Sequence, residues 1–179
     1  MKNDKTGRYI TANLSKTQTL VLTGLIFAAA VVLAMVENML PPLPIAVPGV
    51  KFGLSNIAVM YALFFLGVKQ AYSIAVLKAV FVIVTRGFIA GVLSFSGGIL
   101  SLTIMLLLLL IFKESISYLI ISIMGAVFHN IGQFIVIVVI FSGMNIWAYF
   151  PVLIIAGIIA GIVTSTLLKF IIPAFNRLV

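Results

Sequence analysis

Long apolar runs separated by short polar breaks dominate this sequence. A membrane-spanning helix needs about 20 apolar residues, whereas the strands of a membrane barrel appear as short segments of alternating polarity. We therefore expect an all-α integral membrane protein with about six transmembrane helices. The pattern predicts helices at about residues 19–38, 52–66, 70–85, 98–112, 115–141 and 148–170.

Shorter segments punctuate and flank these runs. Residues 1–17 are predicted as a cytoplasmic N-terminal tail or surface helix, 18–172 as the transmembrane helical domain and 173–179 as a cytoplasmic C-terminal tail. Four prolines within residues 41–48 predict a stiff cap between the first two helices. The Gly- and Ser-rich residues 86–98 predict a connection before the fourth helix.

Composition supports the membrane assignment. Hydrophobic residues make up 64% of the chain and charged residues 8%, whereas soluble domains carry about 25% charged residues. Mean hydropathy is +1.36. The absence of cysteine excludes disulfides, thiol catalysis and iron–sulfur ligation. Because the basic residues lie between apolar runs, membrane topology explains them better than nucleic-acid binding.

The charges also predict the orientation. The chain has eleven Lys and Arg residues and three acids. With a cytoplasmic N-terminus, eight of the eleven cations fall in inner segments, as the positive-inside rule requires. We therefore expect a multi-pass protein with both termini in the cytoplasm. The three remaining cations are Lys51, Lys78 and Arg86.

Lys78 lies near the middle of the third predicted helix. A charge at that depth costs about 2.5–3.5 kcal/mol on insertion scales, so it is a functional-site hypothesis by default. Arg86 follows eight residues later and could line the same cavity. The structural alternatives are that Lys78 snorkels or pairs with Glu37, and that Arg86 is an interfacial anchor.

Further polar residues fall in the same outer half of the predicted bundle. His129 and Gln133 share a helix face at a spacing of four. Together the polar groups predict a net-positive cavity, open to the outside and roofed by the proline segment, that suits a small anionic ligand. The alternative is that they only join helices to one another. The predicted binding residues are Glu37, Lys51, Asn56, Lys78, Arg86, Ser96, His129, Asn130 and Gln133.

Catalytic and metal-binding patterns are missing. The chain has no phosphate-binding loop for ATP. Prenyl-diphosphate chemistry needs clustered aspartates to hold Mg²⁺, and Asp4 is the only aspartate. A single histidine is weak grounds for a metal site. We therefore expect no catalytic residue, no metal site and no enzymatic activity from this chain alone.

Several stretches resemble the signature of one bacterial membrane family, whose members are labelled "heptaprenyl diphosphate synthase component I" or "Gx transporter". They are residues 37–41, 48–56, 96–101 and 125–133, together with Lys78 and the pair Arg86-Gly87. The resemblance covers about residues 19–170 and implies a bacterial cell (plasma) membrane.

This family is similar to the S-components of energy-coupling-factor (ECF) vitamin transporters. Those six-helix proteins bind substrate from outside, beneath the loop between helices 1 and 2. They dock on a transmembrane coupling protein, which works with ATPase subunits, through small residues of helix 1. The resemblance implies an S-component-like bundle whose docking residues are Gly24, Ala28, Ala30 and Ala34.

Three functions are compatible with these features. The first is a membrane-embedded, substrate-binding transport subunit that captures a small anionic or quinone/flavin-related molecule from the outside. The second is a membrane subunit of a flavin- or quinone-linked extracellular electron-transfer system, partnered by a flavinylated protein. The third is a non-catalytic accessory of heptaprenyl diphosphate or menaquinone synthesis. No intrinsic cofactor is expected beyond a bound flavin, quinone or other small anion.

Overall fold

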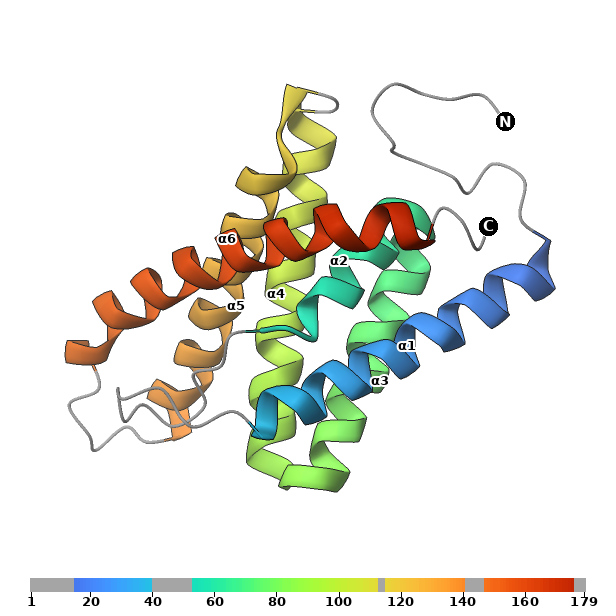
Figure 1. Ribbon diagram of the computed structural model, residues 1–179. Coiled ribbons are helices and arrows are strands. Elements are labelled where there is room, and N and C mark those ends of the chain that lie inside the picture. The colour runs from blue at the N-terminus through green and yellow to red at the C-terminus, as the bar shows by residue number, and fades with distance from the viewer. Residues whose placement is uncertain (1–14, 40–52, 113–114, 141–146, 176–179) are drawn as a thin grey trace.

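The computed structural model describes residues 15–39, 53–112, 115–140 and 147–175 (Figure 1). These residues form six α-helices and the short 3-10 helix η3, and no strand occurs among them. The predicted all-α fold is therefore confirmed. The elements are α1 Lys16–Met39, α2 Asn56–Phe65, α3 Val68–Arg86, α4 Phe88–Phe112, α5 Tyr118–Ile140, η3 Trp147–Tyr149 and α6 Phe150–Phe175.

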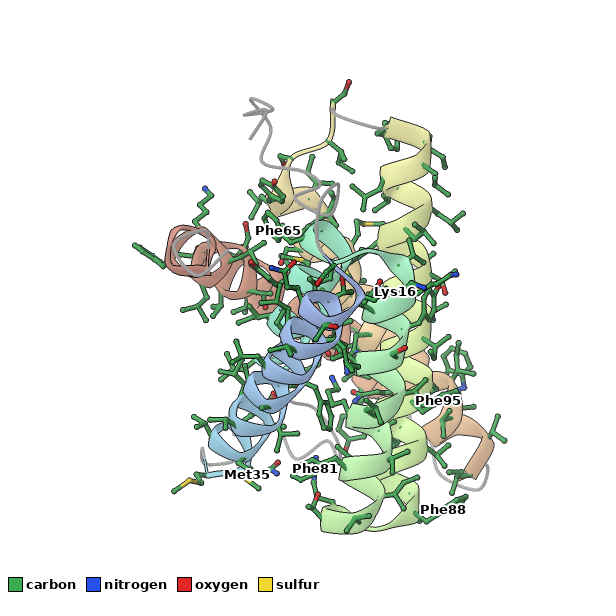
Figure 2. All side chains as sticks on the ribbon, turned by 90° about the vertical axis from the view of Figure 1, so that its right-hand side faces the viewer. Lys16, Met35, Phe65, Phe81, Phe88 and Phe95 are labelled. Carbon is green, nitrogen blue, oxygen red and sulfur yellow. The ribbon has the colours of Figure 1, made fainter. Side chains whose placement is uncertain are left out.

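The helices form two layers. α3, α4 and α5 stand side by side with alternating direction, and α1, α2 and α6 lie against one face of them (Figures 1 and 2). α1 and α6 cross this face obliquely, with the short α2 between them (Figure 1). α1 contacts chiefly α2 and α3, so it is a peripheral helix with a broad apolar surface.

α2 differs from the other helices in length and depth. Five helices are long and apolar enough to cross a membrane, but α2 has only ten residues. Ten residues rise about 15 Å, half of a hydrocarbon core of about 30 Å. Every residue from Ile57 to Phe65 is buried. The second predicted span is therefore a half-length helix that forms the centre of the main hydrophobic cluster and begins inside the bundle.

The predicted Gly- and Ser-rich connection before the fourth helix is wrong, because this segment belongs to α4. α3 and α4 are joined through Gly87 alone, which adopts a φ of 91° that suits glycine. In an apolar environment backbone N–H and C=O groups must hydrogen-bond to each other, so glycine and serine residues can remain within a helix. They instead form a buried face on α4: Gly91, Ser94, Gly97, Gly98 and Ser101.

Small residues also set the contact between α5 and α6. A Cβ atom on Gly161 would lie 2.4 Å from the Cα atom of Ile123, and one on Gly157 would lie 2.9 Å from the Cα atom of Val127. The Gly-x-x-x-Gly spacing of α6 therefore serves packing within this chain.

The predicted docking residues of α1 do not share one environment. Gly24 and Ala28 are exposed, whereas Ala30 and Ala34 are buried inside the bundle. A partner protein could thus reach the first pair but not the second in this structure. The docking role of Gly24 and Ala28 stays a prediction.

The helix ends differ modestly from expectation. α1 begins at Lys16 and α6 continues to Phe175, so both extend into the predicted tails. The proline segment and Lys51 lie outside the described residues.

Candidate binding site

The start of α2 is the centre of the candidate site. Gly53 has a φ of 71°, and its carbonyl oxygen accepts a 2.8 Å hydrogen bond from the backbone N–H of Asn56. This turn begins the helix within the bundle, and backbone carbonyl oxygens accept its first hydrogen bonds, since the N–H of Ile57 also donates to the carbonyl oxygen of Leu54. The N-terminus of α2 is also the positive end of its helix dipole. No side chain caps the helix by hydrogen bonding, but charged side chains of α1 and α3 bind the residues at its start.

Glu37, from the last turns of α1, binds the turn that precedes α2. Its Oε1 atom accepts a hydrogen bond from the backbone N–H of Gly53. The side chain is only 7% exposed. A carboxylate at a helix N-terminus is electrostatically favourable. The bond ties the peripheral α1 to the start of α2, across the segment that separates them in sequence.

Lys78 reaches the same helix start from α3. Its Nζ atom donates to Asn56 Oδ1 at 2.6 Å and to Ser55 Oγ at 3.2 Å. The residue is only 3% exposed. An ammonium group has three N–H bonds, so these two contacts leave one for another acceptor.

Lys78 and Glu37 do not form a direct ion pair. Within the described residues, no Lys or Arg nitrogen lies within 4.0 Å of the Glu37 carboxylate. Lys78 instead bonds to neutral oxygens. The sequence alternative of a Lys78–Glu37 pair is therefore not met as a direct contact within the described residues, although the two opposite charges line the same cavity and attract each other.

A polar cavity of about 60 Å³ opens beside Lys78. Its lining comes from the C-terminal halves of α1 and α3, the start of α2, the first turns of α4, and α5. Figure 2 shows this end of the bundle, where Met35 of α1, Phe81 of α3 and Phe88 of α4 are labelled. Five of the predicted binding residues line this cavity: Glu37, Lys78, Arg86, His129 and Gln133.

Arg86 ends α3 and is exposed at the cavity rim. Lys78 lies two turns deeper on the same helix. Arg86 therefore lies at the opening of the cavity and Lys78 lies deep inside it. Two cations placed in this way attract anions into the cavity. Together with Glu37, they leave a formal charge of +1 on the described lining.

His129 and Gln133 form the wall on α5. Their Nε2 atoms lie 3.3 Å apart. Because an amide nitrogen can only donate, the imidazole accepts at Nε2 and the Gln133 amide oxygen stays available to a ligand. His129 packs closely on α4, where a Cβ atom on Gly97 would lie 2.7 Å from the His129 carbonyl oxygen. The α4–α5 glycine contact thus sets the position of this wall.

Three predicted residues lie away from this lining. Ser96 Oγ bonds to the carbonyl oxygens of Leu93 and Gly132, and so joins α4 to α5. Asn130 Nδ2 donates to the carbonyl oxygen of Leu153 at 2.9 Å, and so joins α5 to α6. Asn56 lies behind Lys78 as its hydrogen-bond partner. Lys51 falls outside the described residues.

Other lining residues were absent from the predicted set. Val82 and Thr85 of α3 follow Lys78 at spacings of four and seven, so helical periodicity could have found them. Ser55 and Ser94 also contribute to the lining. Their participation depends on how α2 and α4 pack, which spacing along one helix does not reveal.

A second, smaller cavity of about 20 Å³ lies on the other side of Asn56. Gly53 and His129 line both cavities. Hydroxyl groups of Ser101, Ser122 and Thr164 contribute to its lining. A space of this size has about the volume of one water molecule, so it is too small to be a separate ligand site.

The fold and the site define the class of this protein: an all-helical membrane protein with an open cavity, lined by charged residues, near one end of its bundle. A family model described as heptaprenyl diphosphate synthase component I matches residues 26–171, and the chain belongs to this family. No curated protein and no solved structure matches the chain significantly. The predicted family is therefore confirmed, and the likeness to ECF S-components stays a prediction.

Proposed function

We propose that this protein is a membrane-embedded binding subunit that captures a small molecule with an anionic group. One observation carries the proposal. Lys78 is buried at a depth where charge is costly, it contacts no carboxylate within the described residues, and it opens onto a polar cavity. Glu37 lies in the same lining but not in contact with Lys78, so an anionic ligand would supply a counter-charge in direct contact.

The proposed direction of capture is from the outside of a bacterial plasma membrane. The positive-inside distribution of cations supports this orientation. The ends of α1 and α3 and the beginning of α4 would then face outward, together with the cavity that they line. Quinone- or flavin-related anions and other small acids are candidate ligands. Delivery to a transmembrane coupling protein with ATPase subunits is the transport form of this proposal.

Thermal unfolding of the detergent-purified protein tests this function. Propionate, inorganic phosphate and flavin mononucleotide serve as probes at matched ionic strength. A ligand that binds only the native state raises the unfolding midpoint with concentration. We expect at least one probe to stabilise the wild type, and Lys78→Met and Arg86→Met to weaken that stabilisation about tenfold or more in apparent affinity. Lys69→Met removes an exposed cation from the opposite end of α3 and serves as the control.

The ligand-free midpoints separate binding from structural roles. Lys78→Met removes a buried charge but also loses two hydrogen bonds, and these effects oppose each other. We expect its ligand-free midpoint to stay near that of the wild type. If Lys78→Met lowers this midpoint strongly and still responds to the probe like the wild type, Lys78 is structural and the proposal is wrong.

The family supports a second candidate, a non-catalytic accessory role in heptaprenyl diphosphate synthesis. Its family description names a component of a synthase, and the sequence lacks the aspartate clusters of the catalytic partner. This function predicts a stable complex with a separate, aspartate-rich synthase. Affinity purification of the tagged protein from its native membrane, followed by mass spectrometry, would detect or exclude that complex.

A further inference from the structure

The candidate cavity contains charges of both signs. Lys78 and Arg86 line it together with Glu37, the only acid among the described residues. Glu37 is also as deeply buried as His129. Glu37 binds Gly53, but its charge opposes an anion in the same cavity, because like charges repel.

Glu37 has hydrogen-bonding capacity left for a ligand. A carboxylate has about four acceptor positions, and within the described residues Glu37 accepts one hydrogen bond, from Gly53. The amide oxygen of Gln133 adds a second acceptor to the lining. The charged donors of the described lining are Lys78 and Arg86, beside neutral hydroxyl and amide groups. The cavity therefore offers cationic donors on α3 and acceptors on α1 and α5.

We infer that Glu37 is a specificity-determining residue, and that the site takes an amphoteric small molecule whose anionic group lies next to an ammonium, N–H or O–H donor. The anionic group contacts Lys78 and Arg86, while the donor contacts Glu37. This inference rests on the proposed binding function. It also disfavours diphosphates and dicarboxylates in this cavity, because their additional negative charge would lie close to Glu37.

Three acids with the same carbon count provide a matched set of probes. Propionate has one carboxylate, β-alanine adds an ammonium group, and malonate has a second carboxylate. Saturation-transfer NMR titrations of the full-length protein in nanodiscs, at constant ionic strength, give their relative affinities. We expect the wild type to prefer β-alanine over propionate, and propionate over malonate, by about tenfold or more between the extremes.

Two substitutions at one position test the assignment. Glu37→Gln retains the size and a hydrogen-bonding carbonyl but removes the charge, and we expect it to abolish or reverse the preference for β-alanine over malonate. Glu37→Asp retains the charge and is expected to keep the wild-type order. Monodisperse elution and a cooperative unfolding transition show that each variant is folded.

The outcomes distinguish this inference from the proposed function. If Glu37→Gln keeps the wild-type order while binding still depends on Lys78, the assignment of Glu37 is overturned and anion binding stands. If no probe binds the wild type or Glu37→Gln, or if Lys78→Met binds all three like the wild type, the proposed function and the inference both fail.

Discussion

The side chains of Asn56 and Lys78 form a 2.6 Å hydrogen bond that joins the buried start of α2 to α3. The bond has a charged donor and a neutral acceptor, so it holds the ammonium group in place without cancelling its charge. Ser55 provides a weaker second contact at 3.2 Å. The start of α2 thus positions Lys78, and the positive charge of Lys78 can still attract an anion in the cavity.

This relationship predicts that Asn56→Asp weakens anion binding. The new carboxylate would pair with Lys78 and lower the charge of the site by one. We expect at least a tenfold loss of apparent affinity, because one unit of charge at short range outweighs a neutral hydrogen bond. Thermal unfolding of the wild type and the variant at increasing concentrations of propionate or inorganic phosphate measures this change in affinity.

Asn56→Ala is the matched control for that substitution. It removes the acceptor without adding charge, so the affinity for anions is expected to stay the same or increase. Its ligand-free stability should fall by about 1–3 kcal/mol, because Lys78 loses a charge-assisted hydrogen bond. Equal anion affinity in Asn56→Asp and the wild type would contradict an electrostatic role for Lys78.

We predict that Gly161→Ala destabilises the protein by about 1–3 kcal/mol, the usual cost of overpacking. The added methyl group would lie 2.4 Å from the Cα atom of Ile123, where the α5 backbone must move. Gly24→Ala is the control, since nothing lies within 4 Å of its added methyl group. Alanine favours helix over glycine by about 1 kcal/mol, so its unfolding midpoint should be unchanged or higher. Equal midpoints for both variants would count against the close α5–α6 contact.

Cysteine labelling tests the orientation of the cavity. The native chain has no cysteine, so Lys69→Cys and Phe88→Cys place single thiols near opposite ends of the hairpin formed by α3 and α4. Both positions are exposed. We expect a membrane-impermeant maleimide to label Phe88→Cys on intact cells, and Lys69→Cys only after permeabilisation. The reverse pattern would place the cavity on the cytoplasmic side and refute capture from outside.

We also predict that the purified chain alone neither hydrolyses ATP nor condenses prenyl diphosphates. The sequence has only three acids and no phosphate-binding loop. Phosphate release from ATP and incorporation of isopentenyl diphosphate in the presence of Mg²⁺ measure these activities. Mock-purified membranes provide the background, and turnover above that background by the single chain would disprove the prediction.

Polar residues in or beside apolar helices identified part of the cavity lining from the sequence, while their binding roles stay predictions. Lys78, His129 and Gln133 stood out because each is polar within an apolar helix, and Arg86 because it follows at the end of one; all four line the cavity. The same criterion also selected Asn130, which instead bonds to a carbonyl oxygen of α6. A polar residue in an apolar helix has to find a partner, but the sequence does not say whether that partner is a ligand or a neighbouring helix.

Hydropathy by itself determined that this is a helical membrane protein, because the cost of exposing a backbone or a charge to lipid depends on local composition. It also placed most helices and the unusual cation on α3. Only the tertiary structure decided that α2 is a half-length helix starting inside the bundle and that Lys78 bonds to Asn56 rather than Glu37. Those features depend on which helices pack together. Such packing joins segments that are distant in sequence, and the local composition of the chain does not specify it.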